Sequence, residues 1–506
     1  MLLTAALLLG GAGQAPAPSA TGETRSQAGK APSAPVPAEM DAPPVVTHHE
    51  ARIGGRLLKY TATTGMMPIA DAQGKVTGHI FFIAYTLDGV TNRAQRPLTV
   101  AFNGGPGSSS VWLHLGAIGP KRVQMLDEGF LPPPPYHLVD NEDSWLDRTD
   151  LVFVDPIGTG YSRATSPEEG KKVWGLEGDI ASVGEFIRLY LTRYERWTSP
   201  LFLAGESYGT TRAAGLSGYL VEHGIALNGI VLISTILNFQ TADFARGNDL
   251  PYILYVPTYT ATAWYHKKLP PDLQKQDLPQ VLAEAEKWAS TDYTIALQKG
   301  TRLTEAERQA AIAQLARYTG LSPAFVDNSD LRITLDRFDA ELLRDRKLTV
   351  GRLDSRFTGA SDLPGSESPD FDPSMTAIRP PYTAMLYDYV RTELGFKSDL
   401  RYYILGGGFT SWDFSSDNQY ADVSGALWSA FAKNPYMKLL VAMGYYDEAT
   451  PYYAAEYTLA HLRLPAASRG NVTTAHFRAG HMVYIDKASL AQLKKDVAAF
   501  MDATFP

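Results

Sequence analysis

Continuous runs of apolar residues recur along this chain and predict strands that are buried on both faces. The clearest runs cover residues 98–103, 151–155, 201–204 and 229–234, and further sheet-like runs cover residues 438–443 and 471–477. Unbroken apolar runs of this length are typical of parallel sheets, because helices cover both faces of such sheets. Two earlier stretches, 48–64 and 76–87, are alternating or apolar and flank a turn signal at residues 71–74. We expect them to form antiparallel strands at the start of the sheet.

A helical pattern lies between two of the predicted strands. Residues 179–197 place apolar side chains three and four positions apart, at Ile180, Val183, Phe186, Ile187, Tyr190, Leu191 and Tyr194. This spacing predicts a helix, and a second amphipathic helix is expected at 488–500. The alternation of strands and helices favours an α/β fold with a mostly parallel central sheet and helices on both faces. A functional crevice in such a sheet lies at the carboxyl ends of its strands.

The pattern changes between residues 239 and 379, where helical stretches replace the buried runs. Helices are expected at 272–288, at 304–318 and from Ser322 onward. Thr304 and Glu307 have the spacing of a capping box, and Ser322 followed by Pro323 is typical of a helix start. We interpret this region as a helical cap inserted over the crevice. The alternative is a separate helical domain that does not contact the site.

The first 44 residues differ in composition from the rest and are expected to form a flexible leader. Residues 2–11 are apolar and are followed by small residues as far as Ala15 and Ala17, which resembles a secretory signal. This favours a secreted or periplasmic protein, with a disordered tail rich in Ala and Leu as the alternative. The run is too short to span a bilayer, so we expect no stable membrane association. The predicted organisation is a leader at 1–44, a core at 45–238, a cap at 239–379 and the rest of the core at 380–506.

Composition excludes several classes of site and partner. Of the 506 residues, 45% are hydrophobic, which is enough for a sizeable core. The chain has no cysteine, which excludes disulfides, thiolate metal sites and cysteine nucleophiles. The net charge is −8 and no dense basic run occurs, so no nucleic-acid partner is expected. None of these features indicates an oligomeric state.

A Gly-x-Ser-x-Gly motif at residues 205–209 follows the predicted strand 201–204 and precedes the helix-compatible stretch 210–220. Strand, tight turn and helix are the context in which this motif forms a nucleophile elbow. The glycines at both ends permit the close approach of strand and helix that the turn requires. Ser207 is therefore the candidate nucleophile.

A serine nucleophile needs a base, and the base needs an orienting acid. In this fold the acid and the histidine follow the serine, in that order, at the ends of later strands. Asp447 comes after the strand 438–443 and His481 after the strand 471–477, while Glu448 is the nearest rival acid. The other histidines fit less well because they precede the elbow or lie within a helix, the cap or a strand: His48, His49, His79, His114, His137, His223, His266, His461 and His476.

A second glycine-rich stretch, residues 103–110, leaves the strand 98–103 and carries three glycines around one proline. Such a loop can turn backbone N–H groups inward as an oxyanion hole. A phosphate-binding loop is the rival interpretation. It lacks support because the Lys-Ser/Thr ending of that motif is absent.

These motifs together resemble those of the serine carboxypeptidase family. The resemblance covers five blocks in order: residues 103–107, residues 141–162, the elbow at 205–209, and the blocks 444–447 and 480–482 that contain the acid and the base. It implies an α/β-hydrolase fold and the removal of C-terminal residues from peptides that have a free C-terminus. It also implies that no metal or organic cofactor takes part.

The resemblance further implies a role for each matched residue. Ser207, His481 and Asp447 would form the triad, and the N–H groups of Gly105 and Tyr208 the oxyanion hole. The substrate's terminal carboxylate would be bound by Asn103, Gly104 and Glu206. Such a carboxylate is repelled by Glu206 unless the two share a proton.

The chain departs from the family pattern at two positions of the first block. Ala117 stands where similar carboxypeptidases carry a second glutamate, and Ser108 replaces a cysteine. We hypothesise that the loss of this glutamate moves the pH optimum towards neutral. Two other functions stay open: an esterase or acyltransferase with the same triad, and a non-catalytic binding protein. The aromatic residues of the cap, among them Tyr252, Tyr255, Tyr259 and Trp264, fit either an apolar substrate pocket or simple core packing.

Overall fold

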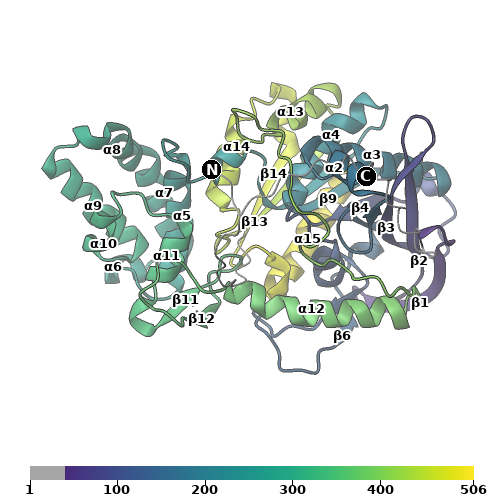
Figure 1. The fold of residues 1–506 in the computed structure, drawn as a ribbon, viewed down its shortest axis with the longest axis horizontal. Coiled ribbons are helices and arrows are strands. Elements are labelled where there is room, and N and C mark those ends of the chain that lie inside the picture. Colours follow the sequence, from purple (N-terminus) through teal and green to yellow (C-terminus); the bar gives the residue numbers. More distant parts are fainter. Residues whose placement is uncertain (1–39, 506) are drawn as a thin grey trace, which may run out of the picture.

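A computed structural model gives the fold of residues 40–505 (Figure 1). Residues 1–39, which make up most of the predicted leader and contain the signal-like run, lie outside the described residues. The first described residues already belong to the fold, because Met40 is buried in the hydrophobic core.

One large sheet organises the structure. Its strands, in spatial order, are β1 (Val45–Ile53), β2 (Arg56–Ala70), β3 (Val76–Leu87), β7 (Asp150–Asp155), β4 (Leu98–Phe102), β9 (Leu201–Ser207), β10 (Gly229–Thr235), β13 (Lys438–Gly444) and β14 (Val472–Phe477). The six strands from β7 to β14 pair in parallel, whereas β1, β2 and β3 pair antiparallel. The short β8 (Arg163–Ala164) adds to β3. The predicted mostly parallel sheet is therefore confirmed, and a turn at Gly54 and Gly55 divides the predicted run 48–64 into two strands.

Helices cover both faces of the sheet and create two hydrophobic layers. One layer contains side chains of α3 (Leu176–Arg193), α4 (Tyr208–Glu222), α13 (Ser424–Lys433) and α14 (Tyr452–His461). The other contains side chains of α1 (Val111–Leu113), α12 (Pro373–Thr392) and α15 (Lys487–Thr504). The remaining elements of this part are α2 (Pro167–Val173) and the hairpin of β5 (Lys121–Val123) and β6 (Leu138–Asp140). Burial of both faces explains why the inner parallel strands are largely apolar, whereas the edge strand β14 is partly exposed and carries polar residues.

A helical lobe, residues 250–360, stands beside the sheet at the left of Figure 1. It contains α5 (Leu250–Tyr265), α6 (Pro271–Gln274), α7 (Leu278–Trp288), α8 (Thr294–Lys299), α9 (Glu305–Thr319), α10 (Pro323–Asn328), α11 (Leu335–Glu341), β11 (Leu348–Val350) and β12 (Thr358–Ala360). The lobe has a hydrophobic cluster of its own. The capping box of Thr304 and Glu307 and the cap at Ser322 are present as predicted.

Proline explains where the lobe departs from the predicted helices. Pro257 lies inside α5, a helix that the sequence pattern does not reveal, and Pro380 and Pro381 lie inside α12. Interior proline normally disfavours a helix, yet both helices are buried along much of their length, and packing overrides the local preference. The predicted boundary at residue 379 consequently falls inside α12. The predicted helix 272–288 is two helices, and β11 with β12 forms a small hairpin where no strand was expected.

Candidate active site

The Gly-x-Ser-x-Gly motif forms a strained turn between β9 and α4. Ser207 has φ 60° and ψ −132°, a region that residues other than glycine rarely occupy and that is typical of functional turns. A Cβ on Gly205 would lie 2.2 Å from the carbonyl oxygen of Gly209, and one on Gly209 would lie 2.7 Å from that of Phe102. Both glycines are therefore required by close backbone contacts around the serine.

Asp447 and His481 meet at the carboxyl ends of β13 and β14. His481 Nδ1 lies 2.8 Å from Asp447 Oδ2, and both side chains are buried. Because β9, β10, β13 and β14 are consecutive parallel strands, this pair and Ser207 lie at the same edge of the sheet. Within residues 40–505 no hydrogen bond joins the Ser207 hydroxyl to His481. Such bonds are often long without substrate and tighten in the reacting complex.

The carboxylate of Asp447 is held by the turn that follows it. The N–H groups of Ala449 and Thr450 donate to Oδ1 at 2.9 and 3.0 Å, and the Thr450 hydroxyl donates to Oδ2 at 2.7 Å. Burial lowers the pKa of His481, but the charge of Asp447 and the hydrogen bond to it raise the pKa by more, so the net shift is upward. The pair is thus arranged to stabilise an imidazolium.

Three groups from elsewhere in the chain fix the loop that carries His481. The Ser234 hydroxyl donates to the His481 carbonyl at 2.5 Å. The His481 N–H donates to the Leu353 carbonyl at 2.6 Å, and the Gly480 N–H to Asp354 Oδ2 at 3.1 Å. Sequence reasoning missed all three groups, because each belongs to a segment more than 100 residues away.

Glu448, the rival acid, points away from His481 and into the lobe. Its Oε1 accepts a hydrogen bond of 2.7 Å from the Thr262 hydroxyl of α5, and its carboxyl group faces the buried Asp339 of α11. Asp447 is therefore the acid that contacts His481. The neighbouring His476 is engaged with Glu456, at 2.8 Å.

The two predicted oxyanion donors lie on neighbouring pieces of backbone. A Cβ on Gly104 would fall 2.3 Å from the amide nitrogen of Tyr208, so the glycine-rich loop packs directly on the first residue of α4. Tyr208 is the first helical residue, and the first N–H groups of a helix lack partners within it. The N–H of Gly105 also has no acceptor among residues 40–505. Both groups are available to a developing negative charge.

Asn103 and Glu206 are joined directly beside the elbow. Asn103 Nδ2 donates to Glu206 Oε1 at 3.0 Å, and Asn103 Oδ1 accepts from the Leu113 N–H at 3.0 Å. Arg212 donates to the Asn103 carbonyl at 2.6 Å. Burial raises the pKa of Glu206 to about 7, although the charge of His481 and hydrogen bonds from neighbouring groups lower it. Glu206 can therefore hold a proton under mildly acidic conditions.

Ala117 supplies no second carboxyl to this pair. It is fully buried, and its carbonyl accepts a hydrogen bond of 2.9 Å from Asn141. Among residues 40–505, no cluster of three or more His, Cys, Asp or Glu side chains could hold a metal ion.

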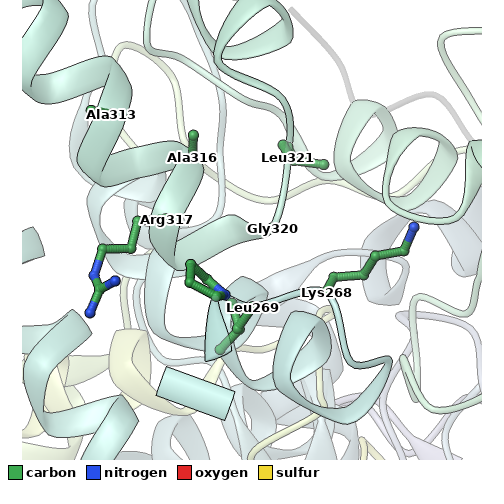
Figure 2. A pocket seen from close by; sticks show the side chains of 8 residues that line it. Lys268, Leu269, Ala313, Ala316, Arg317, Gly320 and Leu321 are labelled. Carbon is green, nitrogen blue, oxygen red and sulfur yellow. The ribbon is translucent and has the colours of Figure 1, made fainter. Parts of the chain in front are cut away.

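The aromatic residues of the lobe lie mainly in its own core. Tyr252, Tyr255 and Tyr259 belong to the hydrophobic cluster of the lobe, which favours core packing over a substrate pocket. A cavity of about 420 Å³ also lies in the lobe, between the segment after α5 and the end of α9 (Figure 2). Its lining includes Lys268 and Arg317 but none of the predicted site residues. We find no helix between residues 40 and 505 with the length and apolar character needed to span a membrane.

Sequence comparison matches residues 57–290 to the serine carboxypeptidase family. The pheromone-processing carboxypeptidase KEX1 of Saccharomyces cerevisiae is 34% identical over 161 residues, which make up 30% of this chain and 21% of that protein. Serine carboxypeptidase-like 5 of Arabidopsis thaliana is 27% identical over 154 residues, 30% of this chain and 33% of that protein. The matched part thus spans about a fifth to a third of these relatives.

Structure comparison extends the similarity to most of the chain. The crystal structure of a prohormone-processing carboxypeptidase from Saccharomyces cerevisiae matches with a TM-score of 0.53 and 16% identity, covering 88% of this chain and 91% of that one. At this identity the match shows the fold alone. It confirms the predicted α/β-hydrolase architecture.

Proposed function

Because residues 57–290 match the serine carboxypeptidase family, we propose that this chain releases C-terminal amino acids from peptides through an acyl-enzyme. The observation that carries the proposal is the hydrogen bond between His481 and Asp447 at the strand edge where the strained Ser207 also lies. Glu206, which is paired with the buried Asn103, directly precedes the nucleophile in sequence.

In the first step the Ser207 hydroxyl attacks the carbonyl carbon of the last peptide bond while His481 Nε2 takes its proton. The imidazolium that forms is stabilised by Asp447 through Nδ1. The negative oxygen of the tetrahedral intermediate is bound by the N–H groups of Gly105 and Tyr208. His481 then gives the proton to the departing amine, which leaves an acyl ester on Ser207.

In the second step water replaces the amine. His481 removes a proton from the water as it attacks the ester, and the same proton returns to Ser207 when the acid product leaves. No metal or organic cofactor has a place in this scheme.

The terminal carboxylate of the substrate would be bound by Asn103, Gly104 and Glu206. Because the pKa of Glu206 is raised to about 7, its carboxyl group is protonated below that pH and can donate to the carboxylate. Above it, two negative charges would face each other. Selectivity for a free C-terminus therefore depends on one buried proton.

We also propose that the lobe within residues 239–379 acts as a cap beside the site, since Thr262 of α5 reaches the residue next to Asp447. The apolar run at 2–11 supports a secreted or periplasmic location. The proposed partners are peptides with a free C-terminus. Neither nucleic acid nor a stable membrane association is part of the proposal.

The test compares an N-blocked dipeptide with its C-terminal amide, with Ser207→Ala as the control. The free acid should release its amino acid rapidly, the amide slowly, and the variant should release none. Cleavage of an aryl ester alone, with Ser207 still required, would instead favour an esterase or acyltransferase. Cleavage of none of these compounds would favour a non-catalytic binding protein.

A further inference from the structure

Tyr484 carries a buried hydroxyl that the scheme above does not use. It lies in the single turn Val483–Ile485, three residues after His481, and its side chain is only 2% exposed. Its hydroxyl has no hydrogen-bond partner among residues 40–505. Buried polar groups are nearly always paired, so an unpaired one requires an explanation.

The hydroxyl lies against the site of Asn103 and Glu206. Burial raises the pKa of Tyr484 well above its usual value. The charge of Glu206 and the direct interaction of its carboxyl group with the hydroxyl raise the pKa further, while the interaction with the Asn103 side chain lowers it. Glu206 has an unpaired atom of its own: Oε1 accepts from Asn103, whereas Oε2 has no partner among the described residues. These two buried polar atoms therefore interact with each other, but neither has a partner at hydrogen-bond geometry among the described residues.

A bare glycine makes room for this arrangement. A Cβ on Gly116 would lie 2.5 Å from Cε2 of Tyr484 and 2.7 Å from the hydroxyl of Tyr382. Any larger residue at Gly116 would push both rings away from their positions. The close packing of its ring on Gly116 thus helps to hold Tyr484 next to the site.

The atoms around this region have complementary roles towards a carboxylate. Asn103 offers an amide donor, and Glu206 can donate only while it is protonated. Tyr484 keeps its proton through the neutral range, because its pKa is shifted upward. A hydroxyl next to a carboxyl group can donate to a second carboxylate that is placed between them.

We propose that the Tyr484 hydroxyl is a specificity-determining donor that binds the terminal carboxylate of the substrate together with Asn103 and Glu206. This inference rests on the proposed carboxypeptidase function and names a further residue of its binding site. It explains why two buried polar atoms are left unpaired side by side.

The test measures binding without turnover, in protein that carries Ser207→Ala. An N-blocked dipeptide and its C-terminal amide are titrated into this protein, with and without Tyr484→Phe. We expect Tyr484→Phe to weaken binding of the free acid about ten- to hundred-fold, as for a hydrogen bond to a charged group. Binding of the amide should stay within about two-fold.

Tyr60→Phe is the matched control. Tyr60 is also buried and its hydroxyl also lacks a partner among the described residues, but it lies in β2. It should leave the affinity for both ligands unchanged. Thermal unfolding of each variant checks that the fold is intact. The proposal is overturned if Tyr484→Phe leaves the affinity for the acid unchanged, or if it weakens acid and amide equally.

The result is separable from that for the overall function. If the wild-type protein cleaves no peptide but Tyr484→Phe still removes a preference for the free acid in binding, the hydrolytic function fails and the role of Tyr484 stands. If the wild-type protein cleaves peptides and Tyr484→Phe keeps the full preference for the acid, the function stands and the role of Tyr484 is overturned.

Discussion

Arg212 of α4 and Asp179 of α3 form a buried ion pair of 2.7 Å directly behind the nucleophile turn. The same guanidinium donates to the Asn103 carbonyl at 2.6 Å. One side chain thus ties the helix of the elbow to the neighbouring helix and to the glycine-rich loop. The position of the predicted oxyanion donors depends on this connection.

We expect Arg212→Met to destabilise the protein by about 3–5 kcal/mol, because it leaves the charge of Asp179 buried and unpaired. Urea unfolding followed by circular dichroism measures the change. The matched control is Arg308→Met, which removes partly exposed pairs with Asp327 and Asp330 and should cost no more than about 1 kcal/mol. Equal losses in the two variants would contradict the assignment.

Thr450→Val tests how the carboxylate of Asp447 is held. The change removes the hydroxyl that donates to Oδ2 at 2.7 Å, so the orientation of His481 should become less precise. We expect kcat to fall about ten-fold, as for one hydrogen bond to a charged group, with little change in KM. Thr458→Val is the control, since its buried hydroxyl bonds only within α14. An unchanged kcat in Thr450→Val would show that the backbone donors suffice.

Glu206 predicts a pH dependence that differs between substrates. The pKa of Glu206 is about 7, so the group is protonated below that pH and negatively charged above it. For a peptide with a free C-terminus, kcat/KM should fall about ten-fold per pH unit above 7, because two carboxylates then repel each other. A C-terminal ester carries no such charge, so its kcat/KM should not show this fall above pH 7, the alkaline limb of the profile.

Glu206→Gln supplies the control for this profile. The neutral amide cannot ionise, so the alkaline limb for the free acid should disappear. The acid limb should remain in every profile, because His481 must lose its proton to act as a base. An alkaline limb that survives in the Gln variant would assign it to another group.

Asp339 and Glu448 predict a loss of stability at alkaline pH. Both are fully buried, and burial raises the pKa of each, with a further rise for Asp339 from the charge of Glu448. The folded protein therefore holds protons that the unfolded chain releases at lower pH, so stability is greatest in acid and falls as pH rises through the folded-state values. Asp339→Asn removes one charge of the pair and should reduce this fall.

Urea midpoints at pH 5 and pH 8 measure the effect. The difference between the two midpoints should be smaller in Asp339→Asn than in the wild-type protein. Asp292→Asn, at an exposed position of the lobe, should keep the wild-type difference. The interpretation fails if both variants behave alike.

Local patterns in the sequence were sufficient to predict much of the sheet and the positions of the candidate residues. The run at 438–443 is apolar after Lys438, and the run at 471–477 is short and strand-like, so the places where they end could be recognised. Asp447 and His481 follow those ends, and parallel strands bring their ends to one edge. The turn around Ser207 was predictable because glycine is needed at both of its ends.

The supporting contacts could not be predicted, because they join segments that are distant in sequence. Ser234 and Leu353 act on His481 through a hydroxyl and a carbonyl, and no local pattern marks either group. Tyr484 follows His481 closely, yet its unpaired hydroxyl becomes visible only when Glu206 is placed beside it. Helix α5 was hidden by Pro257, since the cost of interior proline is local and the compensating packing is not.

The loop between β11 and β12 makes the lobe inseparable from the end of the sheet where Ser207 and His481 lie. Leu353 and Asp354 accept hydrogen bonds from the backbone N–H groups of His481 and Gly480. Arg356 forms a buried ion pair with Asp354. An engineered exchange or trimming of the lobe must therefore keep residues 351–357 in place. Replacing the whole lobe, residues 250–360, with a foreign one would remove the hydrogen bonds that fix the His481 loop together with the helices.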